Sequence, residues 1–111
     1  MDVIERTVEY DRTPEGKSPF REWLNSLKDV KIQQIIDSRL ARLRSGLLGS
    51  RASVGNGVYE LKIHFGSGYR IYFGEVGNKI VLLLWGGVKK SQPQDITKAK
   101  GYWNDYRGTN K

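Results

Sequence analysis

The 111-residue chain contains no cysteine at all. This absence excludes disulfide bridges, thiolate metal sites and a cysteine nucleophile, and it is typical of proteins in a reducing compartment. The longest apolar run, residues 80–85, is far too short to span a bilayer. The N-terminus also lacks the basic start and apolar stretch of a targeting signal. We therefore expect a cytoplasmic protein that does not enter the membrane.

The chain has fewer acidic than basic residues. The chain has 12 Asp and Glu against 19 Lys and Arg, which gives a formal net charge of +7. Such a balance attracts polyanions and favours nucleic acid as the partner, although many small basic proteins bind none. No block of five or more Lys and Arg occurs, so the charge does not belong to a disordered basic tail. The length and the lack of internal repeats predict one domain over residues 1–111.

The periodicity of apolar residues predicts an α+β fold. Helical spacing follows two capping positions in the N-terminal half, whereas period-two alternation begins near residue 58. The predicted order is β-α-α-β-β-β-α, in which the strands at 58–65 and 69–73 form a hairpin. The predicted elements are a strand at 3–10, a helix from Ser18-Pro19 to about Lys28, a helix from Asp29 to Gly46, strands at 58–65, 69–73 and 80–85, and a helix from about Ser91.

Two further segments have distinctive compositions. Residues 46–57 are rich in glycine and serine, which predicts a mobile loop with Arg51 at its middle. Residues 80–85 are apolar at every position, which predicts a central strand covered on both faces. With helices over one face of the sheet, the opposite face of the hairpin at 58–73 is expected to be exposed.

That hairpin face carries Glu60, Lys62, His64, Arg70 and Tyr72, because these residues alternate with apolar ones along two strands. Such side chains suit the cleavage of RNA by attack of its 2′-hydroxyl on the adjacent phosphate. This reaction needs a base, an acid for the leaving 5′ oxygen, and a fixed cation for the charge that develops on the phosphate. Arg70 suits the cation role, because a guanidinium is always charged and binds phosphate through two parallel hydrogen bonds.

The base remains open among four candidates. A lysine can serve where burial and neighbouring cations lower its pKa, and histidine titrates close to neutral pH. No cluster of His, Asp and Glu has the spacing of metal ligands, so the reaction is predicted to need neither a metal nor a cofactor. The candidate catalytic residues are Arg70, Lys62, Lys89, Glu60 and His64, and the candidate RNA-binding residues are Lys90, Tyr72, Arg51 and Tyr102.

Each of these features also has a plainer interpretation. The hairpin face can be a solvated surface with ion pairs such as Glu60 with Arg70, and a lone histidine on a strand is more often structural. Tyr102 and Tyr106 can stack on bases or simply pack against the core. Residues 86–90 resemble a phosphate cradle only weakly, because short glycine-lysine loops are common.

Over roughly residues 3–107 the chain resembles the RelE/ParE toxin superfamily, and specifically its phage-related, HigB-like branch of addiction module killer proteins. The resemblance rests on four segments and three later positions: Phe20-Arg21-Glu22-Trp23-Leu24, Gly57-Val58-Tyr59-Glu60-Leu61-Lys62, Gly68-Tyr69-Arg70-Ile71-Tyr72-Phe73, and Leu84-Trp85-Gly86-Gly87-Val88-Lys89-Lys90-Ser91-Gln92 with Asp95, Ile96 and Ala99. It implies a RelE-like fold, in which a small antiparallel sheet packs against the two N-terminal helices and a C-terminal helix follows. It also implies the toxin of a toxin–antitoxin pair.

The resemblance also implies roles for particular residues. RNase members of the superfamily cut mRNA in the ribosomal A site without a metal, and an antitoxin encoded by the adjacent gene inhibits them. Arg70 matches their phosphate-stabilising arginine, Lys62 a basic position on the preceding strand, and Lys89 and Lys90 the basic loop before the last helix. The catalytic tyrosine of some relatives has two candidate counterparts, Tyr102 and Tyr106.

Family membership leaves other activities open. ParE-type members of the superfamily inhibit DNA gyrase and need no nuclease site, and a noncatalytic basic nucleic-acid-binding module is a further alternative. The cationic hairpin face favours an mRNA endonuclease that inhibits translation. The antitoxin is expected to be a helix-turn-helix DNA-binding protein, since this chain shows no such motif.

Overall fold

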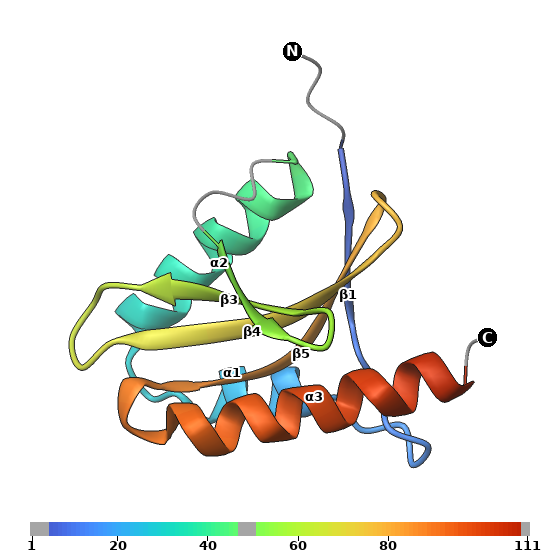
Figure 1. Cartoon of the computed structure of the whole chain (residues 1–111). Helices are drawn as coiled ribbons and strands as arrows, with labels where there is room; N and C mark the ends of the chain where they lie inside the picture. The colour runs from blue at the N-terminus through green and yellow to red at the C-terminus, as the bar shows by residue number, and fades with distance from the viewer. Residues whose placement is uncertain (1–4, 47–50, 110–111) are drawn as a thin grey trace.

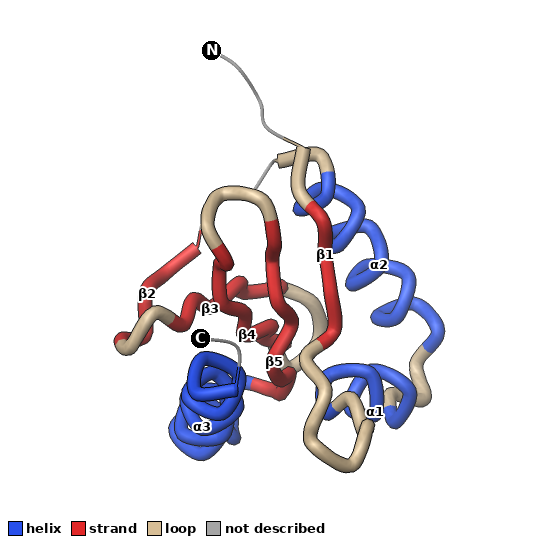
Figure 2. The backbone as a smooth tube through the Cα atoms, turned by 90° about the vertical axis from the view of Figure 1, so that its right-hand side faces the viewer, coloured by secondary structure: helices blue, strands red, loops and turns tan. Residues whose placement is uncertain are grey.

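The computed structural model describes residues 5–46 and 51–109 of the chain. They form three layers, in which helices α1 and α2 cover one face of a five-stranded sheet and α3 covers the other (Figure 1; Figure 2). The α+β class is confirmed. In chain order the elements are β1 (Thr7–Tyr10), α1 (Pro19–Ser26), α2 (Val30–Arg44), β2 (Arg51–Gly55), β3 (Val58–Ile63), β4 (Tyr69–Val76), β5 (Ile80–Val88), the 3₁₀ turn η1 (Lys89–Ser91) and α3 (Gln92–Thr109).

The sheet is mixed, which corrects the prediction of a purely antiparallel one. Its strand order is β1-β5-β4-β3-β2, and β1 runs parallel to β5 while the other three pairings are antiparallel. The chain leaves β1 through two helices, so no hairpin turn forces β1 to run antiparallel to its neighbour. The predicted central position of residues 80–85 is confirmed, because β5 has a paired strand on each side. Of the predicted first strand, Val3 and Ile4 lie outside the described residues.

Capping residues explain where the first two helices begin. The side chain of Ser18 accepts a hydrogen bond from the backbone N–H of Arg21, and Pro19 occupies the first helical turn. The side chain of Asp29 accepts from the backbone N–H of Lys31 at 2.9 Å. Helix α1 ends at Ser26 instead of about Lys28, because the chain turns to an extended conformation before the cap of α2.

Strand β2 corrects the prediction of a mobile loop over residues 46–57. Arg51–Gly55 pairs antiparallel with β3, and residues 47–50 lie outside the described part of the chain. The two strands are joined by Asn56 and Gly57, which both have positive φ angles, of 59° and 84°. An Asn-Gly pair in this conformation is the preferred connection of a two-residue hairpin. This dipeptide was the sequence signal for β2, and the surrounding glycine and serine residues obscured it.

The two faces of the sheet bury separate hydrophobic clusters. On one face, Phe20 and the apolar stripe of α2 pack against alternate residues of β3, β4 and β5. On the other face, Ala99 and Trp103 of α3 pack against the sheet, and the aromatic ring of Trp103 leaves no room for a side chain at Gly74. The second cluster consists of Val58, Tyr72, Leu82, Leu84, Ala99 and Trp103. The predicted exposure of the hairpin face is therefore wrong for Glu60, Arg70 and Tyr72, which are buried. It is confirmed for Lys62 and His64.

Helix α3 is the longest described helix, and it carries several charged residues. No helix in residues 5–46 and 51–109 combines the length and the apolar character needed to cross a membrane.

Candidate functional site

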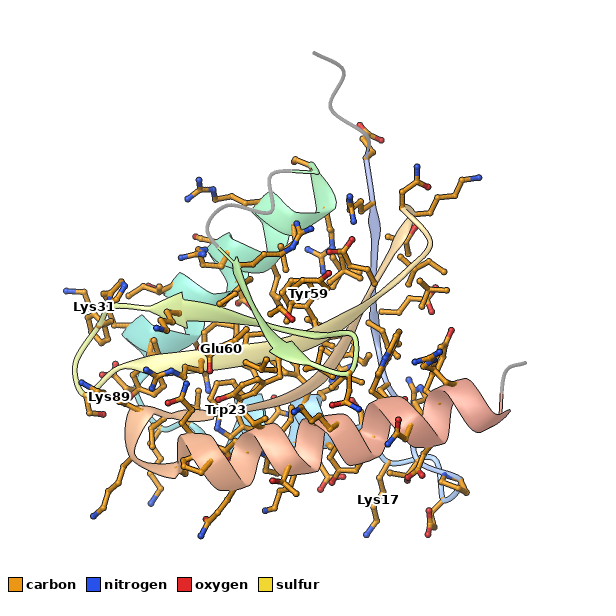
Figure 3. All side chains as sticks on the ribbon, in the orientation of Figure 1. Lys17, Trp23, Lys31, Tyr59, Glu60 and Lys89 are labelled. Atoms are coloured by element: carbon orange, nitrogen blue, oxygen red, sulfur yellow. The ribbon has the colours of Figure 1, made fainter. Side chains whose placement is uncertain are left out.

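The register of the β3–β4 hairpin places the polar candidates beside one another. Glu60 lies opposite Tyr72, and Lys62 lies opposite Arg70, on the face of the sheet that α3 covers in part. Lys89 is held close to the β3–β4 turn, because its backbone N–H donates to the carbonyl of Gly68 at 3.2 Å. In Figure 3, Glu60 lies on the sheet and Lys89 lies near the turn that joins β3 and β4.

Glu60 and Arg70 form a buried ion pair at the centre of this group. The Arg70 Nε atom lies 3.5 Å from Oε2 of Glu60, and the same carboxylate oxygen accepts a hydrogen bond of 2.8 Å from Gln92 Nε2. Glu60 is 2% exposed and Arg70 is 8% exposed. The Glu60–Arg70 ion pair of the plainer interpretation is present, but it is buried and is not part of a solvated surface. Gln92, the first residue of α3, contacts the pair and helps to cover it.

The guanidinium of Arg70 keeps unused hydrogen-bond donors. Its Nε and Nη1 atoms are buried, and neither has a hydrogen-bond partner among the described residues. Leaving a buried donor unpaired is costly, about 1–3 kcal/mol and more for a charged group. Arg70 also lines a pocket of about 270 Å³, which we call the Arg70 pocket; its lining residues are Lys62, Ile63, His64, Gly68, Tyr69, Arg70 and Lys89. The unpaired donors, the pocket and three neighbouring basic side chains together make a site suited to an anion.

Lys62, His64 and Lys89 are exposed, so a ligand in the Arg70 pocket can reach all three. Lys90 is also exposed but lines neither this pocket nor the larger one beside it. Four of the predicted catalytic residues therefore meet at the Arg70 pocket. The fifth, Glu60, forms the ion pair with Arg70 but does not line this pocket.

Tyr72 lies on the predicted face of the sheet but is not exposed there. Its side chain is fully buried beneath α3, so it is closed to stacking on an RNA base, and the prediction of a base-contacting tyrosine is corrected. Burial, and next the negative charge of Glu60, raise the pKa of the Tyr72 phenol. The hydroxyl therefore stays protonated at physiological pH.

Arg51 is also placed differently from the prediction. It is the first residue of β2, its Nη2 atom lies 3.1 Å from Oε1 of Glu75, and its guanidinium lies over the ring of Tyr59. These contacts hold the side chain against the sheet. Arg51 is 31% exposed at its side chain and still lines a pocket, but it is not a free side chain on a mobile loop.

Tyr102 is separated from the basic residues. It is half-buried, its ring lies 6.0 Å from that of Trp85, and it lines a different pocket with Asp11, Asp105 and Tyr106. None of the residues lining that pocket lines the Arg70 pocket. Burial, and next the charge of Asp11, raise the pKa of the Tyr102 phenol. The structure thus does not bring either candidate C-terminal tyrosine to Arg70.

The glycines before Lys89 serve packing instead of a phosphate cradle. Gly86 and Gly87 belong to β5, and a side chain would clash with the ring of Trp23 at Gly86 and with the carboxylate of Asp95 at Gly87. Asp95 is buried, and it accepts hydrogen bonds from Trp85 Nε1 at 2.8 Å and from the hydroxyl of Ser91. This network fixes the start of α3, and with it the position of Lys89.

A second, larger pocket adjoins the Arg70 pocket. Its volume is about 540 Å³, and we call it the α2 pocket; its lining residues are Arg39, Arg42, Arg51, Ala52, Glu60, Lys62 and His64. Sequence analysis missed Arg39 and Arg42 as site residues. Their spacing of three positions places both on the polar face of α2. This spacing does not indicate that the face lies beside the end of β3.

Two observations limit the chemistry available here. In the described part of the chain, no three His, Asp or Glu side chains gather closely enough to hold a metal ion. Of the described residues lining the two basic pockets, Glu60 is the only acid. The site offers guanidinium, ammonium and imidazole groups around one buried carboxylate, and this set is suited to binding phosphate.

Comparison with known proteins identifies a relative of this chain. No profile of a known protein family matches the chain. A protein of Haemophilus influenzae, described as uncharacterized, is 41% identical over 81 residues, which span 73% of this chain and 82% of the relative. With that identity over most of both sequences, the chain belongs to the same protein family as this Haemophilus influenzae protein.

Proposed function

We propose that the chain is a toxin of the RelE/ParE type with a RelE-like fold, and that it cuts mRNA on the ribosome in the cytoplasm without a metal. One observation carries the proposal: the buried Arg70 guanidinium has donors without a partner among the described residues, and it lines a pocket with Lys62, His64 and Lys89. A phosphate in the Arg70 pocket would lie beside this guanidinium and balance its positive charge. A planar guanidinium matches two phosphate oxygens at once.

In the proposed reaction the 2′ oxygen of a ribose attacks the adjacent phosphorus, and the bond from phosphorus to the 5′ oxygen breaks. The products are a 2′,3′-cyclic phosphate and a free 5′-hydroxyl. A base removes the proton of the 2′-hydroxyl, and an acid protonates the departing 5′ oxygen. Arg70 stabilises the negative charge that develops on the other phosphate oxygens.

The placement of the candidates supports a division of roles. Lys62 is favoured as the base, because it lies opposite Arg70 in the strand register and lines the same pocket. His64 and Lys89 line that pocket and are the candidates for the acid. Glu60 is assigned to positioning Arg70, because it is 2% exposed and engaged by Arg70 and Gln92.

The proposed partner is an antitoxin encoded by the adjacent gene that brings the helix-turn-helix used to bind DNA. The exposed basic residues around Arg70 favour an acidic segment of the antitoxin that becomes ordered on binding and covers the site. Such a segment would compete with mRNA for the same guanidinium.

Brief induction of the chain in cells, followed by mapping of new mRNA 5′ ends, tests the proposal. Arg70→Ala removes the guanidinium, Arg70→Lys keeps the charge beside Glu60 in case the first variant misfolds, and Arg44→Ala is a matched control at an exposed arginine outside both pockets. We expect in-frame cuts with the wild type and Arg44→Ala, and none with either Arg70 variant.

Other outcomes separate the alternatives. Growth arrest without new 5′ ends would remove the nuclease proposal. A DNA-damage response with intact transcripts would indicate gyrase inhibition. The absence of both effects would leave a noncatalytic binding module.

A further inference from the structure

The lining of the α2 pocket includes Arg39 and Arg42, which have no role in the chemistry proposed above. Arg39 and Arg42 of α2 form one side of it, and the starting residues of β2 and the last residues of β3 form the other. It shares Lys62 and His64 with the Arg70 pocket. A ligand that extends from Arg70 past these two shared side chains therefore enters the α2 pocket.

Arg39 and Arg42 have no acidic partner in the described part of the chain. Among the described residues, no carboxylate lies within ion-pair distance of Arg39 or Arg42. Arg39 is partly buried, and the only hydrogen bond of its side chain to a described residue is a long one of 3.5 Å from Nη1 to the backbone carbonyl of Lys62. Burial, and next the positive charge of Arg42, lower the pKa of Arg39. Two uncompensated cations are therefore held together at this place.

Arg51 differs from these two residues. Its guanidinium is already paired with Glu75, which in turn accepts a hydrogen bond from Arg6. Arg51 therefore lines the α2 pocket, but Glu75 already neutralises its charge. The positive charge available to a ligand in the α2 pocket comes from Arg39 and Arg42, together with the shared Lys62.

We infer that the α2 pocket binds a second phosphate of the same RNA strand whose cleaved phosphate lies at Arg70, with Arg39 and Arg42 as its ligands. The identity of the ligand as RNA rests on the proposed function. A single strand carries one negative charge at each link, so a strand fixed at Arg70 brings its next phosphates past Lys62 and His64. The guanidinium groups of Arg39 and Arg42 match phosphate oxygens in charge and geometry.

This inference makes strand length a determinant of binding. A dinucleoside monophosphate has one phosphate, so it fills the Arg70 pocket and leaves the α2 pocket empty. A pentanucleotide has further phosphates to reach Arg39 and Arg42. The site is thus built for a segment of single-stranded RNA and not for a mononucleotide.

The test measures binding of 2′-O-methyl RNA, which lacks the attacking hydroxyl and is not cut. Fluorescence anisotropy of the full chain with a labelled pentanucleotide and a labelled dinucleotide is recorded at several salt concentrations, from about 50 to about 200 mM. The test variant is Arg39→Gln with Arg42→Gln. The control, Lys28→Gln with Arg44→Gln, removes the same charge from exposed positions outside both pockets.

For the pentanucleotide, the slope of log K against log salt concentration is negative, and we expect its magnitude to fall by about 0.7 in the test variant. That is the value for one lost phosphate contact on a single strand. The slope for the dinucleotide should be the same in the test variant as in the wild type. The slope for the pentanucleotide should be the same in the control variant as in the wild type. Three outcomes would overturn the inference. The magnitude of the pentanucleotide slope falls as much in the control variant as in the test variant, the slope of the test variant is unchanged, or the pentanucleotide does not bind. A pentaglutamate peptide that binds as tightly and depends equally on Arg39 and Arg42 would also overturn the assignment to RNA.

The outcome for the proposed function is read separately. If the pentanucleotide binds through Arg39 and Arg42 but induction yields no new mRNA ends, the second phosphate site stands and the nuclease proposal falls. If mRNA is cut through Arg70 while the Arg39 and Arg42 variant binds like the wild type, only the second site falls.

Discussion

The carboxylate of Glu60 lies 3.5 Å from Nε of Arg70, and the two side chains are only 2% and 10% exposed. Gln92, the first residue of α3, donates to the same carboxylate oxygen. The pair therefore joins β3, β4 and α3 below the pocket that Arg70 lines. A contact that belongs to the interior of the domain also fixes the direction of the guanidinium that faces a ligand.

Removal of the Glu60 carboxylate should destabilise the domain. Glu60→Ala leaves the buried Arg70 guanidinium without its counterion, and we expect the free energy of unfolding to fall by about 1–3 kcal/mol. Glu60→Gln keeps an oxygen that can accept from Gln92, so its loss should be smaller. Urea unfolding measures both values, and a Glu60→Ala protein as stable as the wild type would show that the ion pair contributes nothing.

The Asn56-Gly57 turn allows a second test of stability, because a matched glycine exists. Gly57 has a φ of +84°, and a Cβ there would lie 2.8 Å from Nε1 of Trp103, whereas Gly16 has a φ of +83° with nothing within 4 Å. Both alanine variants bear the same backbone strain, about 1 kcal/mol or more. We expect Gly57→Ala to lose an additional ~1 kcal/mol or more in urea unfolding, because an overpacked contact must shift. Equal losses would mean that the Trp103 contact has no cost.

Local signals predicted most of the elements. Ser18 and Asp29 mark two helix starts, and the alternation from residue 58 marks the hairpin, because caps and period-two patterns act within a few residues. The run at 80–85 marked the central strand because burial on both faces leaves no polar position. Strand β2 was missed, because its pairing with β3 outweighs the loop-like composition of residues 46–57.

The site was harder to predict than the elements. Alternation along β3 and β4 places Glu60, Arg70 and Tyr72 on one face, but it does not tell that α3 lies over that face and buries them. Arg39 and Arg42 lie on a helix that is distant in sequence from Lys62, and only the packing of α2 beside β3 brings them together. Contacts of this kind depend on tertiary structure and leave no periodic trace.

Asp11 should give the folded chain a pH-dependent stability. This residue is 5% exposed, and burial, opposed by a backbone hydrogen bond at Arg12, raises its pKa from 3.8 to about 6. An acid with a higher pKa in the folded state binds more protons when folded than when unfolded. Its contribution to the free energy of unfolding therefore decreases as the pH rises from about 4 to about 6, and it is level at higher pH.

The variant Asp11→Asn removes this titration. We expect it to raise the free energy of unfolding at pH 7 by about 1–3 kcal/mol and to change it little at pH 4. Asp37→Asn, at an exposed carboxylate on α2, is the control and should show no such difference. Chemical denaturation at the two pH values measures the effect. An Asp11→Asn gain that is equal at both would contradict the raised pKa.

Lys62 and Lys90 separate a role at the scissile phosphate from the effect of net charge. Both are exposed lysines, but Lys62 lies opposite Arg70 and lines both basic pockets, whereas Lys90 lines neither. Under the proposed function, Lys62→Ala should slow mRNA cleavage on purified ribosomes by about 10²–10⁴-fold, the contribution of a general base. Lys90→Ala removes the same charge and should change the rate only a few-fold. Equal losses would assign the effect to long-range electrostatic attraction, and full activity of Lys62→Ala would move the base to His64 or Lys89.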